Sequence, residues 1–211
     1  ESTPTEYLYG QNDRVMTHLQ FDALLKKDAG AVKSAKSAAF IQCVGSRDEN
    51  RPYCSRVCCT HTVEKALELK ELNPDMQVYV LYRDMRTYGP REDLYTEARA
   101  KGVIFIRYSL DAKPQVAAAG SGVEITAEDH VLKRPLVISA DYLVLAAAIE
   151  PNESGELVEL YKCATNADGF LSEAHPKLRP VDMSVDGLFL AGLCHYPKPV
   201  DESISQAQAA V

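Results

Sequence analysis

Four of the six cysteines are close enough in sequence to bind one soft metal centre. Cys43, Cys54, Cys58 and Cys59 follow the spacing C-x10-C-x3-C-C. Thiolates are the soft ligands that iron–sulfur clusters, zinc and copper(I) prefer. The spacing matches neither paired C-x2-C motifs nor the common ferredoxin run. It therefore favours a cluster site with an uncommon ligand arrangement.

Three other interpretations of these cysteines stay open. A single cysteine is often only a small buried hydrophobic residue, although four so close together are poorly explained in this way. Zinc also binds cysteine thiolates. A redox-active disulfide, such as one between Cys43 and Cys54, is a further alternative. The sequence favours an iron–sulfur cluster over these three.

Arginines are interleaved with the cysteines. Arg47, Arg51 and Arg56 lie in the same loop, where each either offsets the negative charge of thiolates or is simply solvated. The helix expected to begin near Cys58 adds the positive end of its dipole. We expect the loop to favour an anionic, sulfur-bound group.

Composition indicates an ordinary globular protein of 211 residues, 46% hydrophobic and 25% charged. The net charge is −7 without a basic stripe, so nucleic acid is not an expected partner. No apolar run approaches the ~20 residues that span a membrane. Cysteines without a secretory signal indicate the reducing cytoplasm. Because the chain lacks an initial Met and ends within a helical pattern, we expect it to be part of a longer protein.

The first half of the chain alternates strand and helix patterns. Apolar runs predict strands over residues 38–44, 78–82 and 103–108. Helical spacing with suitable ends predicts helices over about 58–72 and 91–100. Strands that alternate with helices form parallel sheets through right-handed crossovers. We therefore predict a three-layer α/β core.

The second half begins with short strands and tight turns. Residues 115–118, 122–126 and 136–139 predict a small antiparallel β-meander. Buried strands are predicted over 141–148 and 187–191. Together with the first half, this order is typical of a nucleotide-binding domain in a flavoprotein that binds two dinucleotides.

The phosphate-binding turn of such a domain is replaced here. Nucleotide-binding folds use a glycine-rich turn after the first strand, but only Gly45 follows it here and the motif G-x-G-x-x-G is absent. The cysteine loop stands in its place. Arg83, Asp84 and Arg86 follow the second strand, where such folds contact the ribose, and we interpret these arginines as surface residues.

Four segments closely resemble the A subunit of heterodisulfide reductase and its bacterial relatives. They are IQCVGSRDENRPYCSRVCC, LYRDMRTYG, KLRPVD and GLCHYPKPVDESISQAQAA. The resemblance runs from about Tyr9 to Val211. It implies a thioredoxin-reductase-like, FAD/NAD(P)-binding fold. It also implies an NAD(P)-binding-like domain at 36–140 with the cysteine loop, and parts of a FAD-binding domain at 1–35 and 141–211.

The resemblance also implies cofactor ligands. It assigns Cys43, Cys54, Cys58 and Cys59 as ligands of a [4Fe–4S] cluster. It places a second set in the strip that contacts FAD: Gly192, Lys198, Pro199 and Glu202. Leu193 follows Gly192 where ordinary disulfide reductases carry Asp. No catalytic residue is implied.

The resulting functional hypothesis is electron transfer. The resemblance implies an oxidoreductase subunit that passes electrons between FAD and [4Fe–4S] clusters, with other subunits of a heterodisulfide-reductase-type complex as partners. We expect the chain alone to be inactive. One alternative is a pyridine-nucleotide-dependent dithiol/disulfide oxidoreductase, which the absence of G-x-G-x-x-G and C-x-x-C disfavours. Another is an assembly module with structural zinc.

Overall fold

The computed structural model describes residues 1–130 and 133–211, and the chain divides into two compact units. Unit 1 comprises Glu1–Pro52 and Cys58–Ala148. Unit 2 comprises Tyr53–Val57 and Ile149–Val211. In the part of the chain that the structure describes, no helix combines the length and apolarity needed to cross a membrane.

Unit 1 is built on a five-stranded sheet with the order β1-β8-β2-β3-β4. All of its neighbouring strands are parallel, which confirms the predicted parallel sheet. The strands are β1 (Val15–Thr17), β2 (Ser37–Val44), β3 (Gln77–Tyr82), β4 (Ile104–Arg107) and β8 (Tyr142–Ala147).

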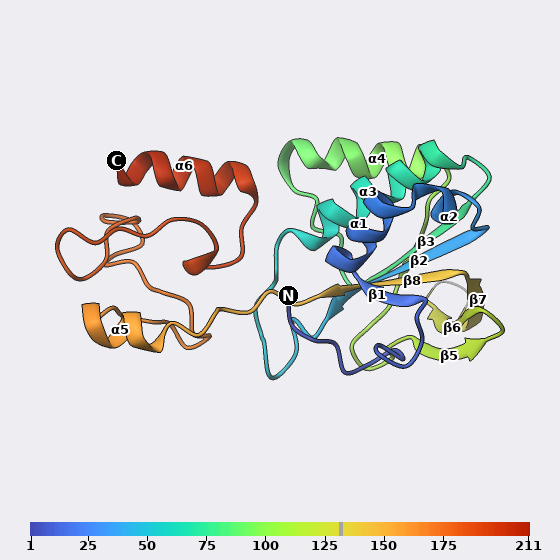
Figure 1. Ribbon diagram of the computed structural model, residues 1–211, viewed down its shortest axis with the longest axis horizontal. Coiled ribbons are helices and arrows are strands. Elements are labelled where there is room, and N and C mark those ends of the chain that lie inside the picture. Colours follow the sequence, from blue (N-terminus) through green and yellow to red (C-terminus); the bar gives the residue numbers. More distant parts are fainter. Residues whose placement is uncertain (131–132) are drawn as a thin grey trace. The chain divides into compact units, whose positions relative to one another are not determined.

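Helices cover one face of this sheet (Figure 1). They are α1 (His18–Lys27), α2 (Ala29–Lys33), α3 (Cys58–Leu72) and α4 (Glu92–Ala100), the last preceded by the 3₁₀ turn η1 (Gly89–Arg91). The predicted helices over 58–72 and 91–100 are therefore confirmed. No sequence pattern predicted β1, α1 or α2.

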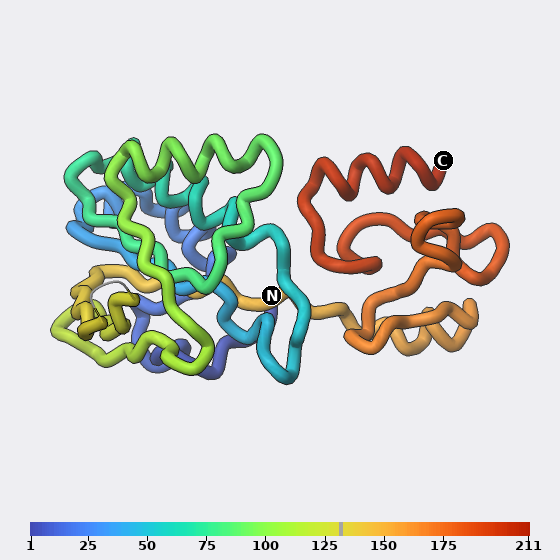
Figure 2. Tube along the Cα trace, turned by 180° about the vertical axis from the view of Figure 1, so that it is seen from behind, coloured from blue at the N-terminus to red at the C-terminus, as the bar shows by residue number. Residues whose placement is uncertain are grey.

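A three-stranded antiparallel sheet covers the opposite face. Its yellow-green segment lies on the side of unit 1 away from the helices (Figure 2). The sheet consists of β5 (Gln115–Ala119), β6 (Gly122–Asp129) and β7 (Arg134–Ala140), paired in sequence order. The predicted meander is confirmed. The unit has three layers: helices, parallel sheet and meander.

The burial of both sheet faces explains the continuous apolar runs. In β2, Ala38 and Phe40 pack in the cluster on the helix side. Ala39 and Ile41, which point the other way, pack in the cluster that includes Ile125 of the meander. A strand covered on both faces needs apolar residues at every position rather than at alternate ones.

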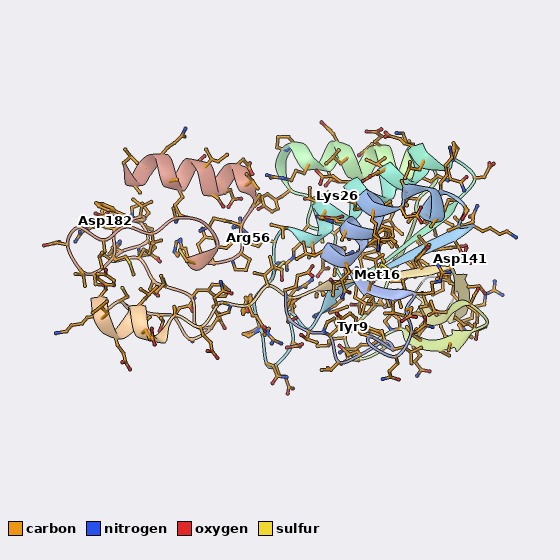
Figure 3. All side chains as sticks on the ribbon, in the orientation of Figure 1. Tyr9, Met16, Lys26, Arg56, Asp141 and Asp182 are labelled. Atoms are coloured by element: carbon orange, nitrogen blue, oxygen red, sulfur yellow. The ribbon has the colours of Figure 1, made fainter. Side chains whose placement is uncertain are left out.

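The two ends of the sheet have different chemistry. Asp141, labelled in Figure 3, stands just before β8 at the amino edge. Its Oδ2 accepts hydrogen bonds from the backbone N–H groups of Lys36 (2.7 Å) and Ser37 (3.0 Å). At the carboxyl edge, the pairing of β2 with β8 shifts register between Ile41 and Val44. The first cysteine of the loop lies in this irregularity.

Unit 2 contains little regular structure. Its helices are α5 (Gly155–Tyr161) and α6 (Val200–Ala210), with a 3₁₀ turn η2 (Gly192–Cys194). The predicted strand over 187–191 is wrong. Phe189 forms only an isolated bridge with Asp182, and its side chain is 53% exposed. An isolated bridge does not extend into a ladder, so the apolar run remains irregular.

The division into compact units leaves the predicted domain boundaries at residues 36 and 140 a prediction. β8 lies between β1 and β2 in the sheet. Residues on both sides of 36–140 therefore complete the sheet of unit 1. The sequence order of the strands did not reveal this arrangement, because β1 and β8 are more than a hundred residues apart.

We expect Gly122→Ala to destabilise unit 1. A Cβ at Gly122 would lie 2.3 Å from the carbonyl oxygen of Ala140, so the backbone must shift. Overpacking of this kind costs about 1–3 kcal/mol. Gly30→Ala is the matched control, since its Cβ would make an ordinary 3.4 Å contact with Asp28 Oδ1. Urea unfolding followed by circular dichroism measures both variants, and equal stabilities would contradict the expectation.

His18 gives the stability of unit 1 a dependence on pH. Burial lowers the pKa of His18 from 6.5 to about 3, and His61 and Lys65 add to the effect. The unfolded chain therefore binds a proton that the folded chain does not. The contribution of His18 to the free energy of unfolding should be constant above about pH 6.5. It should fall as the pH drops toward 3, by up to about 1.4 kcal/mol per pH unit. His18→Gln should flatten this slope in urea titrations; an unchanged slope would contradict the assignment.

Candidate functional site

Cys43 stands at a strained position at the end of β2. Its φ is 60°, in the left-handed region that side chains rarely adopt. Gln42, directly before it, is fully buried and anchors the backbone. Tyr108 Oη donates to Gln42 O (2.5 Å), and Gln42 Nε2 donates to Thr62 Oγ1 on α3 (2.5 Å). A strand irregularity that re-aims a side chain is typical of functional sites.

Cys58 and Cys59 open α3, and both are buried. The pKa of Cys59 is lowered to about 7, first by a hydrogen bond from the side chain of Cys58. The backbone of Arg86 and the charges of Arg47 and Arg86 lower it further, against the opposing effect of burial. Cys59 Sγ also lies 3.8 Å from Asp84 O. A thiol in this environment is substantially ionised near neutral pH.

Arg47 lies between the thiol of Cys43 and the carboxylate of Asp84. Its Nη1 lies 3.8 Å from Cys43 Sγ, and its Nη2 lies 2.6 Å from Asp84 Oδ2. The hydrogen bond from Arg47 also holds the pKa of Asp84 below its usual value. Arg83 Nη1 donates to Arg47 O (2.7 Å), and Arg107 Nη2 contacts Asp84 Oδ1 (3.0 Å). Arg83 is half-buried and supports the backbone of Arg47, whereas Arg86 is exposed.

Cys54 belongs to unit 2, in the segment Tyr53–Val57. Its Sγ accepts a hydrogen bond from the backbone N–H of Arg56 at 3.3 Å. Ile149 holds this segment from both directions: Tyr53 Oη donates to its carbonyl oxygen (2.9 Å), and its N–H donates to Ser55 Oγ (3.0 Å). The cysteine loop therefore belongs to both compact units.

The donor types fit an anionic sulfur-ligated group. Unit 1 supplies three buried thiols, one with a lowered pKa, beside a guanidinium and the start of α3. Among the described residues, no three or more Cys, His, Asp or Glu side chains are gathered closely enough to hold a metal ion. All six cysteines are described, and none forms a disulfide. The four-cysteine ligand set stays a prediction.

Arg56 joins the cysteine segment to the second predicted site, within unit 2. Its guanidinium, labelled in Figure 3, pairs with the carboxylate of Glu202 at 2.9 Å. It also donates to Pro197 O (3.3 Å) and lies 5.4 Å from the centre of the Tyr196 ring. The cysteine segment and the strip that contains Tyr196, Pro197 and Glu202 therefore meet at one guanidinium.

Lys198 and Glu202 line a cavity of about 520 Å³ in unit 2. The ammonium of Lys198 is buried and donates to Gly192 O at 2.8 Å. Pro199 precedes the first residue of α6, and Glu202 lies in its first turn. The structure therefore brings the four predicted cofactor-binding residues to one place: two line the cavity, and Gly192 and Pro199 support them.

The cavity is also lined by polar residues that were not predicted as site residues, among them Glu173, His195 and Gln206. Gln206 lies four residues after Glu202 on α6, and helical residues with this spacing share a face; that spacing could have indicated it. Glu173 lies in an irregular segment, where no periodic pattern exists. The thiol of Cys194, next to His195, donates to Ala191 O (3.1 Å).

Known proteins resemble the chain along almost its whole length. No model of a protein family matches it. It is 37% identical over 97% of its length to an iron-sulfur A subunit of the CoB–CoM heterodisulfide reductase of Methanopyrus kandleri, covering 33% of that protein. It is also 37% identical to the A subunit of the H(2):CoB-CoM heterodisulfide,ferredoxin reductase of Methanothermobacter thermautotrophicus, again over 97% and 33%. The chain thus spans about a third of the length of these relatives.

Solved structures support the fold. The HOCl-induced flavoprotein disulfide reductase RclA from Escherichia coli matches with a TM-score of 0.61 at 14% identity, over 99% of this chain and 41% of RclA. Thioredoxin reductase from T. acidophilum matches with a TM-score of 0.59 at 11% identity, over 100% and 58%. The predicted α/β, thioredoxin-reductase-like fold is confirmed. Over nearly all of its length, the chain is a homologue of one third of the A subunit of heterodisulfide reductase.

Proposed function

We propose that the chain is part of an electron-transferring iron–sulfur flavoprotein subunit in a heterodisulfide-reductase-type complex. The observation that carries the proposal is the group of thiols around the Arg47–Asp84 pair, at the carboxyl edge of the parallel sheet. Nucleotide-binding folds bind cofactor phosphates at this edge. Here thiols and arginines take that position. The homology to an iron-sulfur subunit supports the proposal.

In this proposal, Cys43, Cys54, Cys58 and Cys59 bind one [4Fe–4S] cluster. Four thiolates give an oxidised cluster a net charge near −2. Arg47 lies beside Cys43 and offsets part of this charge. Cys54 stands four residues before Cys58 in the sequence. The bound cluster would supply one-electron transfer, and these residues would hold it and adjust its potential.

The flavin contacts belong to unit 2. We propose that Gly192, Lys198, Pro199 and Glu202 contact FAD, which would supply the two-electron chemistry when bound. The protein's part is to place a buried ammonium and an ion-paired carboxylate at the cavity. Leu193 follows Gly192 here, so a hydroxyl contact through Asp at that position is not part of the proposal.

The remaining assignments follow from the resemblance. Residues 36–140 form the NAD(P)-binding-like core, and 1–35 and 141–211 are the parts of the FAD-binding domain present in this sequence. The partners are other subunits of the complex, in the cytoplasm. The chain by itself is inactive, because electron transfer needs cofactors and partners beyond these residues.

Anaerobic reconstitution with iron and sulfide tests the cluster. We expect a brown protein with about four iron atoms per chain. Cys54→Ala and Cys58→Ala should each lower the iron content and the visible absorption, since each removes one thiolate. Cys163→Ala is the control, because Cys163 neighbours Met183 in unit 2 and lies outside the loop. Unchanged iron in both loop variants would refute the ligand set, and stoichiometric zinc would favour the assembly module.

Titration with FAD tests the flavin contacts. We expect binding weaker than about micromolar, because the sequence contains no G-x-G-x-x-G to hold the pyrophosphate. Each missing charge-assisted hydrogen bond costs about 1.5–3 kcal/mol, so two or three change affinity by orders of magnitude. Calorimetry or flavin fluorescence measures the affinity. Stoichiometric binding tighter than micromolar would show that the flavin site is elsewhere.

A further inference from the structure

Gln206 on α6 has only one possible amide orientation. Its Oε1 lies 2.9 Å from the backbone nitrogen of Gly192 and 2.7 Å from Nζ of Lys198. Both of these groups are hydrogen-bond donors, so the atom that faces them must be the amide oxygen. The amide NH₂ of Gln206 therefore points to the other side, toward His195.

This orientation determines where His195 carries its hydrogen. Gln206 Nε2 lies 2.7 Å from His195 Nδ1. An amide NH₂ can only donate, so Nδ1 must be the acceptor and carries no hydrogen. The hydrogen of the neutral ring is then on Nε2, which lies 2.7 Å from Glu173 Oε2 and donates to this carboxylate.

The four side chains form a hydrogen-bonded chain with one direction. Lys198 donates to Gln206, Gln206 donates to His195, and His195 donates to Glu173. The chain begins at a cation and ends at an anion. Consecutive hydrogen bonds that point the same way polarise and strengthen one another.

The two basic side chains in this hydrogen-bonded chain are buried. Lys198 is 4% exposed and His195 is 8% exposed. Lys198 Nζ lies 3.9 Å from the centre of the Tyr196 ring. The centres of the Tyr196 and His195 rings are 4.3 Å apart. A buried ammonium is costly unless its hydrogens are accepted. Gly192 O, Gln206 Oε1 and the face of Tyr196 supply these acceptors.

The surroundings of His195 oppose a second hydrogen on its ring. Burial lowers the pKa of His195 and Lys198 lowers it further, whereas Glu173 raises it. The other charged groups that line the cavity are Asp201 and Glu202, and Arg56 neutralises Glu202. An imidazolium would also direct its Nδ1–H at the NH₂ of Gln206. The hydrogen-bond geometry and the surrounding charges therefore both favour a neutral His195 ring.

We propose that Gln206 is a positioning residue that holds Lys198 as a fixed cation and locks His195 as the neutral Nε2–H tautomer. The cavity then presents one ammonium and one uncharged imidazole to its ligand. A fixed cation of this kind favours a ligand that gains negative charge on reduction. This last step rests on the proposed flavin site, whereas the tautomer does not.

Nitrogen-15 NMR of the 211-residue chain tests the proposal without any cofactor. Long-range ¹H–¹⁵N correlations distinguish a protonated ring nitrogen from an unprotonated one, and His195→Gln identifies the signals. We expect His195 to be neutral at neutral pH, with hydrogen on Nε2 and none on Nδ1. A predominantly Nδ1–H ring, or an imidazolium, would overturn the proposal.

Two variants distinguish a specific effect of Gln206 on His195 from a general effect of added negative charge on α6. Gln206→Glu places a carboxylate oxygen opposite His195 Nδ1, which favours a hydrogen there and an imidazolium between two carboxylates. We expect the pKa of His195 to rise by about one unit or more. Gln208→Glu adds the same charge to an exposed position two residues later on α6 and should shift it by less than about 0.3 units.

Equal shifts in these two variants would refute the positioning role. If Gln206→Glu does not fold, Gln206→Leu is the second test, because it removes the donor that favours an unprotonated Nδ1, so the pKa of His195 should rise while Glu173 still accepts from Nε2–H. An unchanged pKa of His195 in that variant would also refute the role. Failure of FAD to bind leaves all of these results in place, so the two proposals can fail separately.

Discussion

The central position of β8 is the constraint on which unit 1 depends. All six of its residues are buried, and it pairs with β1 on one side and β2 on the other. Just beyond it, the N–H of Ala148 donates to Val44 O (3.0 Å), and Ala148 O accepts from the N–H of Ser2 (2.7 Å). The irregular end of β2 that carries Cys43 is therefore held by the chain that leaves β8.

In both candidate sites, neighbouring groups hold a cationic side chain in one position. In unit 1, Arg47 lies between a thiol and the carboxylate of Asp84, so the guanidinium has one fixed orientation beside the sulfur. In unit 2, Gln206 orients Lys198 and His195. Each site keeps a cation that is held by neighbouring acceptors. Groups that are ordered before a cofactor binds lose less entropy when it does.

Sequence patterns predicted the strands and helices that bury continuous or periodic apolar residues, as in β2 and α3. The three-residue strand β1 was missed because it is too short for a pattern, although Thr17 and Gln20 form a capping box that marks the start of α1. The spacing of the four loop cysteines predicted a shared site, and that ligand set stays a prediction. Arg47 and Asp84, which are 37 residues apart, meet only through the pairing of strands, so no local pattern could reveal them.

The membership of Tyr53–Val57 in unit 2 has a consequence for biosynthesis. Unit 2 consists of this short segment and the stretch that begins at Ile149. A ribosome that has completed the segment must add more than ninety residues before its hydrogen-bonding partner emerges. Domains generally fold as units during synthesis. Because β8 is the last strand of unit 1 to be made and most of unit 2 follows it, unit 1 can complete its sheet first, and the contacts of Arg56 with Pro197 and Glu202 form last. Maturation of a centre that uses all four thiols would have to wait for the last part of the chain.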